Sequence, residues 1–158
     1  MADLKKILEM AGFENVKTLL ASGNVIFESS EKKANSVQKL VEATIEKKFG
    51  FAVPTIIRTM EEIEKLMKIN PFKDIKVTPE TRLYITFRGD MTNKKTIKIP
   101  YKDPQFDFHI LKVLDGEIIS YLLVDKDRGT VDAMGILEKE FGKNITTRNW
   151  NTVMKIAK

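Results

Sequence analysis

The sequence predicts an α+β fold with mostly antiparallel sheet and with helices packed on one face. Three observations support this prediction. Apolar residues recur at helical spacing in several segments, apolar runs of strand length lie between these segments, and two turn sequences join neighbouring runs. The turns are Ser22-Gly23-Asn24 and Asp115-Gly116, in which Gly, Asn and Asp tolerate the backbone conformations of a tight hairpin. Helices interspersed with antiparallel strand pairs are typical of the α+β class.

The first half of the chain contains a helix, a hairpin, a second helix and a further strand. The predicted elements are a helix over 4–11, strands over 16–21 and 25–28, a helix over 35–49 and a strand over 52–57. Gly12 and Gly50 end the two helices, and Pro54 marks the last strand as an edge strand or as a strand beginning at the proline. The order α-β-β-α-β matches a ferredoxin-like βαββαβ unit without its opening strand.

The second half continues with helices and antiparallel strands. We expect a short helix from Thr59 that stops at Asn70-Pro71, and a strand from Arg82 to Phe87. A second hairpin is expected over 106–110 and 118–124, followed by a helix over 131–141 capped by Thr130. The chain contains no Ser- or Pro-rich linker, so a single domain over 1–158 is expected, with halves over about 1–58 and 59–158.

Composition restricts the class of protein. The 158 residues include no cysteine, which removes disulfides, thiolate nucleophiles and cysteine-ligated metals, and which fits a reducing, cytoplasmic location. No apolar run reaches the roughly 20 residues that cross a bilayer, so no membrane association is expected. The net charge is +5, and lysine dominates the 27 basic residues, which favours solubility over sequence-specific nucleic-acid reading.

The most distinctive stretch runs from Thr146 to Thr152 and contains the only tryptophan. Thr146 or Thr147 is expected to cap a C-terminal helix, whose apolar stripe comprises Trp150, Val153, Met154 and Ala157. Burial of Trp150 would make this stretch a structural anchor. Arg148 and Asn149 leave a second interpretation open, because Arg and Asn beside a helix N-terminus also suit an anionic group.

No motif assigns a chemistry. His109 is the only histidine, and its place in an alternating strand favours a surface or half-buried residue over a catalytic one. The carboxylates Asp125, Asp127 and Asp132 do not meet the EF-hand spacing and are typical of a solvated turn. The sequence predicts no catalytic residue, no metal site and no cofactor.

Two basic clusters favour either a solvated face or a nucleic-acid footprint. The tail from Lys143 onward carries no Asp or Glu and includes Lys155. The second cluster consists of Lys94, Lys95, Lys98 and Lys102.

Three stretches together resemble the domain-of-unknown-function 1697 family. They run from Ala2-Asp3-Leu4 through Gly12-Phe13, from Ala21 to Phe27, and from Thr146 to Thr152. The resemblance implies an α+β fold built from ferredoxin-like halves, and no established activity, substrate or cofactor. Similar proteins begin with an apolar strand and a Gly/Asn-rich loop, so we expect Met1 to be an internal methionine. Without that strand, another segment or a second protomer would have to pair with the backbone groups that the strand would otherwise bind.

These observations predict a non-catalytic module that binds a small anionic ligand or another partner. The predicted ligand site is a groove formed by Ser22, Gly23, Asn24, Arg148, Asn149 and Asn151. The alternative is RNA binding through Lys94, Lys95, Lys98, Lys102 and Lys155, with Tyr84 or the pair Phe106 and Phe108 as stacking platforms. A homodimer formed through an unpaired sheet edge is a further expected partner.

Overall fold

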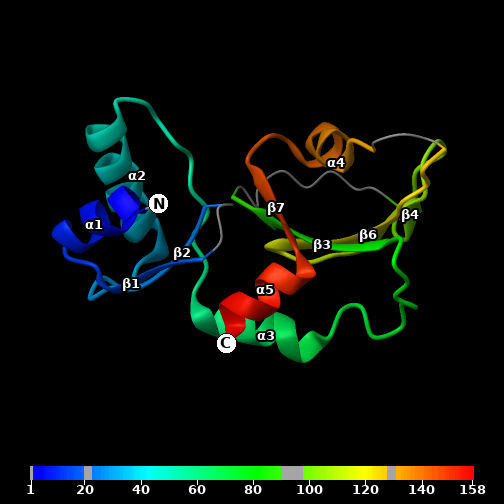
Figure 1. Cartoon of the computed structure of the whole chain (residues 1–158), viewed down its shortest axis with the longest axis horizontal. Coiled ribbons are helices and arrows are strands. Elements are labelled where there is room, and N and C mark those ends of the chain that lie inside the picture. Colours follow the sequence, from blue (N-terminus) through cyan, green and yellow to red (C-terminus); the bar gives the residue numbers. More distant parts are fainter. Residues whose placement is uncertain (1, 20–22, 90–97, 128–130) are drawn as a thin grey trace. The chain divides into compact units, whose positions relative to one another are not determined.

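The computed structural model describes residues 2–19, 23–89, 98–127 and 131–158. It divides into two compact units, Met1–Thr59 and Met60–Lys158 (Figure 1). The helices and antiparallel sheets of both units confirm the α+β class.

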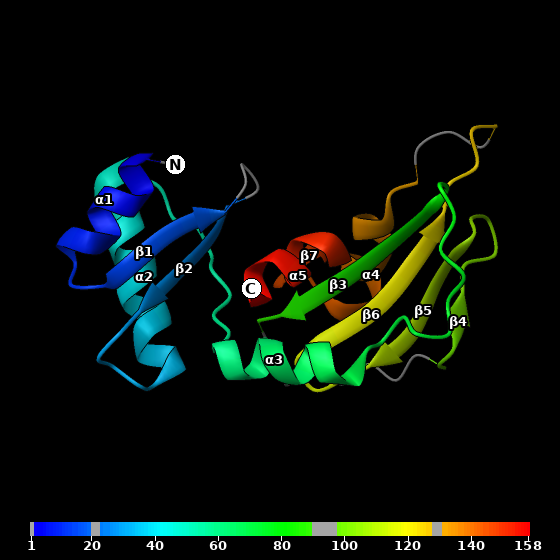
Figure 2. The same cartoon turned by 60° about the horizontal axis from the view of Figure 1, so that its bottom comes forward.

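The first unit contains two helices and one hairpin. Its elements are α1 (Ala2–Met10), β1 (Glu14–Leu19), β2 (Asn24–Glu28) and α2 (Ala34–Phe49), with β1 and β2 antiparallel (Figure 2). These are four of the five elements expected for this half. Gly50 ends α2 in the left-handed conformation (φ 80°), and its N–H donates to the carbonyl of Glu46 at 2.8 Å.

The core of the first unit lies between the helices and the hairpin. Its buried residues are Leu8, Phe13, Val16, Val37, Val41 and Ile45. Phe27 of β2 packs against this cluster, and its ring centroid lies 4.6 Å from that of Phe13. The side chains of Val25 and Phe27 therefore face the helices, whereas Ile26 points to the other side of the hairpin because side chains alternate along a strand.

The prediction of a strand over 52–57 is wrong, because these residues pair with no strand in the described part of the chain. Side chains of α2 supply the hydrogen bonds instead. The Oε1 atom of Glu42 accepts from the backbone N–H of Thr55 at 2.7 Å, and Nε2 of Gln38 donates to the Thr55 carbonyl at 2.9 Å. Val53 and Ile57 still pack against the core, so the apolar pattern reflects burial rather than a strand ladder.

This contact predicts an acid-sensitive first unit. The Thr55 N–H holds the pKa of the Glu42 carboxyl below its ordinary value, an effect that burial partly opposes. A carboxyl with a lowered folded pKa stabilises the fold above its unfolded pKa, and this contribution is lost as the pH falls through the folded pKa. Glu42→Gln should therefore cost about 1–2 kcal/mol at neutral pH and progressively less as the pH falls below the ordinary pKa of a glutamate.

Thermal unfolding of the protein and of Glu42→Gln across this pH range checks the prediction. The melting midpoint should fall more steeply with acid in the unchanged protein than in the variant. Glu46→Gln, which alters an exposed glutamate one turn further along α2, is the matched control. Parallel pH profiles for the unchanged protein and Glu42→Gln would contradict the role given to Glu42.

The second unit is a five-stranded antiparallel sheet with three helices among the described residues. Its elements are α3 (Met60–Ile69), β3 (Thr81–Arg88), β4 (Tyr101–Lys102), β5 (Phe108–Val113), β6 (Glu117–Leu123), α4 (Ala133–Phe141), β7 (Ile145–Asn149) and α5 (Trp150–Ala157). The strand order is β4-β5-β6-β3-β7. The expected elements are present, and β4 and β7 are additions.

Helices lie on both faces of this sheet, where one covered face was expected. Figure 1 shows α4 on one side and α3 with α5 on the other. The α4 side contains the buried cluster Phe108, Ile110, Ile118, Leu122, Leu137 and Phe141. The strand expected from Arg82 to Phe87 is confirmed as part of β3, in which Tyr84 lies opposite Ser120 and Ile85 lies opposite Ile119.

The cap of α4 is Asp132, whose Oδ1 accepts from the N–H of Gly135 at 2.9 Å. The expected cap, Thr130, lies outside the described residues. A carboxylate at this position accepts a hydrogen bond from a backbone donor of the first turn, and its negative charge interacts favourably with the positive end of the helix dipole.

Candidate functional site

The stretch from Thr146 to Thr152 forms the end of a strand and the start of a helix. Thr146 and Thr147 lie in β7, so the prediction that one of them caps the helix is wrong. β7 pairs with β3 through the backbone, and a side-chain hydrogen bond also joins them, since the hydroxyls of Thr147 and Thr86 are 2.8 Å apart. A β-branched residue that pairs with a central strand is favoured there over a helix cap.

Asn149 caps α5, and Arg148 is bound to its own strand. The Oδ1 atom of Asn149 accepts from the N–H of Asn151 at 3.0 Å. Nη1 of Arg148 donates to Oγ1 of Thr146 at 2.7 Å and to the Thr147 carbonyl at 3.0 Å. Burial lowers the pKa of Arg148 from its ordinary value. These contacts give Arg148 and Asn149 structural roles in the strand and at the helix start.

The other half of the predicted groove belongs to the first unit. Gly23 has a positive φ of 82°, and Nδ2 of Asn24 donates to the Leu19 carbonyl at 3.2 Å. Asn24 thereby holds the hairpin together. Ser22 lies outside the described residues. A ligand site that combines these residues with Arg148, Asn149 and Asn151 remains a prediction.

The predicted nucleic-acid residues occupy separate parts of the second unit. Lys98, Lys102 and Lys155 are exposed, whereas Lys94 and Lys95 lie outside the described residues. Lys102 is in β4 at one edge of the sheet, and Lys155 is in α5, which follows β7 at the opposite edge. The described lysines therefore form no continuous stripe across the sheet.

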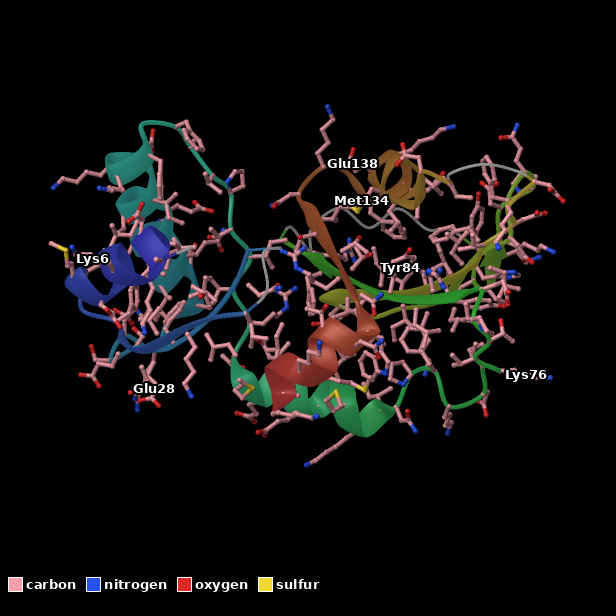
Figure 3. The ribbon with its side chains drawn as sticks, in the orientation of Figure 1. Lys6, Glu28, Lys76, Tyr84, Met134 and Glu138 are labelled. Carbon is pink, nitrogen blue, oxygen red and sulfur yellow. The ribbon has the colours of Figure 1, made fainter. Side chains whose placement is uncertain are left out.

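The aromatic residues expected as stacking platforms are mostly covered. Phe108 is fully buried on the α4 side of the sheet, so its assignment as a platform is wrong. Tyr84 packs against the same cluster, and burial raises the pKa of its hydroxyl. Figure 3 shows Tyr84 on the sheet and Met134 on α4.

A different aromatic pair lies on the opposite face of the sheet. The rings of His109 and Tyr121 are stacked, with centroids 4.5 Å apart and planes 4° apart. Nε2 of His109 is 2.5 Å from Oδ1 of Asp107, and Nζ of Lys102 is 3.9 Å from the same oxygen. Burial, followed by the Asp107 charge, raises the pKa of Tyr121. Sequence reasoning placed His109 on or near the surface but missed Tyr121, because cross-strand register is set by the folded sheet.

The edges of the two sheets differ in how they are protected. Edge strands commonly carry bulges, charged residues or very short ladders that discourage pairing with another chain. The ladder of β1 is interrupted between Glu14 and Lys17, and Asn15 lies there in the left-handed region (φ 50°). In the second sheet, β4 has only two residues, Tyr101 and Lys102. The edge strand β7 carries Arg148 and runs directly into α5.

The second edge of β2 carries a charged residue only at its end. Val25 and Ile26 pair with Thr18 and Lys17 of β1, Phe27 lies opposite the irregularity in that ladder, and all three side chains are partly exposed. Among the described residues, no strand pairs with the second edge of β2. The charged Glu28 stands at the end of the strand, on the side of the hairpin away from the helices (Figure 3). The sheet edge of β2 is therefore the candidate binding surface.

Other kinds of site find less support in the described part of the chain. One small open depression is lined by Glu42, Glu46, Ala52, Val53 and Pro54. No three His, Cys, Asp or Glu side chains among the described residues are grouped so that they could hold a metal ion. None of the helices in the described ranges is long and apolar enough to cross a membrane.

Comparisons with known proteins agree with the fold. The chain is similar to a solved structure of a conserved bacterial protein from Streptococcus pneumoniae, with a TM-score of 0.71 and 20% sequence identity. The alignment covers 99% of this chain and 86% of that chain. No curated protein sequence matches the chain. The family described as "Protein of unknown function (DUF1697)" matches residues 1–110, and the chain belongs to this family.

Proposed function

We propose that this chain is a non-catalytic interaction module that binds an extended polypeptide segment along the free edge of β2. The observation that supports the proposal is the partly exposed apolar run Val25, Ile26 and Phe27 on a strand whose second edge pairs with no described strand. The alternative of a small anion is less favoured, because Arg148 and Asn149 already bind the backbone and side chains around them.

Strand addition would complete the first unit in two ways. A two-stranded hairpin is marginally stable, and a third strand adds backbone hydrogen bonds to N–H and C=O groups that no strand among the described residues pairs. Val25 and Phe27 are partly exposed although they pack against the core, so the added strand would also cover apolar surface. Recognition of this kind depends mainly on the backbone of the partner, with alternate side chains giving specificity.

The test uses a short peptide of alternating valine and threonine, acetylated at its N-terminus and amidated at its C-terminus. Amide exchange of the protein, measured by NMR, should slow in β2 when the peptide is added. A second peptide, N-methylated at every residue, is the matched control because neither of its edges keeps the backbone donors that a ladder needs. The proposal predicts protection in β2 with the first peptide and none with the second.

Two results would overturn the proposal. Equal protection by both peptides would show that binding does not use a backbone ladder. Protection confined to β4 or β7, with none in β2, would place the interaction at another edge.

We propose single-stranded RNA binding as a second candidate function, supported by one observation. The stacked rings of His109 and Tyr121 lie beside Lys102, which is opposite His109 in the register. Aromatic rings beside a cation are the usual means of holding unpaired bases. Asp107 opposes this function, because its carboxylate lies against both His109 and Lys102 and would repel phosphate.

Fluorescence anisotropy with a labelled oligouridine distinguishes the two functions. RNA binding should weaken steeply as salt rises, since phosphate contacts release counterions. Tyr121→Ala should then weaken binding, whereas Tyr84→Ala, which alters a ring packed on the other face, is the matched control. Binding that is unchanged in Tyr121→Ala would remove this candidate.

A further inference from the structure

We infer that Asp107 keeps the candidate RNA site closed to phosphate at neutral pH, and that protonation of His109 opens the site by releasing Lys102 from Asp107. This inference rests on the second candidate function, because it assigns a regulation to the same site. It also gives a role to the carboxylate that opposes phosphate binding there.

Asp107 lies against two groups that can carry positive charge. Its Oδ1 atom is 2.5 Å from Nε2 of His109 and 3.9 Å from Nζ of Lys102, so one oxygen serves both. Lys102 is opposite His109 in the register, and its side chain is 66% exposed, so its ammonium group can turn toward solvent. The imidazole stacks on the ring of Tyr121. A change in the charge of the imidazole therefore acts directly on the partner of Lys102.

His109 is the group of this cluster whose charge changes near neutral pH. The titratable groups beside it are Asp107 just before β5, Lys102 on β4 and Tyr121 on β6. Histidine ordinarily gains a proton between about pH 8 and about pH 5, whereas aspartate and lysine ordinarily keep their charges there. Burial raises the pKa of Tyr121, so its hydroxyl stays neutral. His109 is also the only histidine of the chain, which makes any pH response easy to assign.

The two protonation states give the cluster different charges. With a neutral imidazole, the Asp107 carboxylate offsets the Lys102 ammonium and repels phosphate. With a protonated imidazole, the cluster has a net positive charge, and the short charge-assisted bond to His109 competes with the longer contact to Lys102. Lys102 can then contact a phosphate while a base stacks beside the two rings. Acid should therefore strengthen the binding of single-stranded RNA.

Fluorescence anisotropy with the labelled oligouridine, at about pH 7 and about pH 5.5, tests this on the unchanged protein. Binding at low salt should be at least about fivefold tighter at the lower pH, and log affinity should fall more steeply with log salt, by about one unit of slope. The range ends at about pH 7 because an N-terminal amino group ordinarily titrates just above it. Equal affinity at the two pH values overturns the inference.

Three variants separate the roles of the residues. Asp107→Asn removes the carboxylate, so at about pH 7 it should bind as tightly as the unchanged protein does at about pH 5.5. Asp115→Asn, which alters an exposed carboxylate in the turn at the other end of β5, is the matched control. His109→Gln cannot gain a proton and should lose the pH response. The inference is refuted if His109→Gln keeps that response, or if Asp107→Asn binds no more tightly than Asp115→Asn at neutral pH.

The outcomes also separate this inference from the function on which it rests. If oligouridine binds through Tyr121 equally well at both pH values, the candidate function stands and only the regulation is refuted. If neither the unchanged protein nor any variant binds oligouridine at either pH, both fail. Should a variant not fold, the pH series of the unchanged protein still decides the question.

Discussion

Replacing Trp150 by alanine is expected to lower the free energy of unfolding of the second unit by about 3–5 kcal/mol. The indole is only 8% exposed, and its ring meets that of Phe72 edge-on with centroids 5.5 Å apart. Phe72 is itself buried, and Val153 lies one turn further along α5 with no exposure. Truncation would therefore leave a cavity lined by side chains that cannot easily move into it.

Urea unfolding followed by circular dichroism measures this effect, because the variant loses the only tryptophan fluorophore. Trp150→Phe should lose less stability, since a smaller cavity remains. Lys155→Ala, on the exposed side of α5, is the matched control and should change stability by less than about 0.5 kcal/mol. A loss below about 1 kcal/mol in Trp150→Ala would show that the indole does not anchor the helix.

The substitution Phe108→Ala should cost a similar amount, about 3–5 kcal/mol. Phe108 has no solvent exposure and lies in the cluster between the sheet and α4, with Leu137 and Phe141 among its members. The residue is on β5, which pairs with β4 on one side and β6 on the other. A cavity there would weaken the attachment of α4 to the sheet.

Urea unfolding monitored by the fluorescence of Trp150 reports on this unit. Lys112→Ala, at an exposed position of the same strand, is the matched control. Near-equal stabilities of the two variants would contradict the assignment of Phe108 to the core.

Local sequence patterns were sufficient to predict most of the helices and strands. The stripe containing Leu8 predicted α1, the alternation around Ile85 predicted β3, and the buried face containing Val153 predicted α5. In each element, neighbouring residues determine which side is apolar, and burial follows from that pattern. Membership of the DUF1697 family was likewise indicated by short stretches of sequence and is confirmed by the family match.

The errors arose where distant residues decide the outcome. The segment containing Thr55 has the composition of a strand, but Glu42 and Gln38 take its backbone hydrogen bonds. Threonine is a residue type that often caps a helix, but Thr147 pairs with Thr86 on a strand 61 positions earlier in the chain. Composition cannot show which partner a backbone group finds, because that partner is fixed by tertiary packing.

The candidate binding surface could be predicted only in outline. An unpaired edge was expected from the order of elements in the first half, and the structure adds which strand carries the least protected edge. The difference lies in Asn15 of β1, whose backbone is left-handed at the point where the ladder is interrupted, while no residue from Asn24 to Glu28 has a positive φ. A positive φ at a non-glycine residue is weakly encoded in sequence, so this distinction needed coordinates.

The direct passage from β7 into α5 fixes the number of residues at that junction. Asn149 is the last residue of the strand and Trp150 the first of the helix, with no loop between them. One additional residue there would turn the helix by about 100° and rotate its indole out of the core. Related chains should therefore vary in length elsewhere and have no insertion or deletion at the junction between β7 and α5, whatever exposed side chains they carry there.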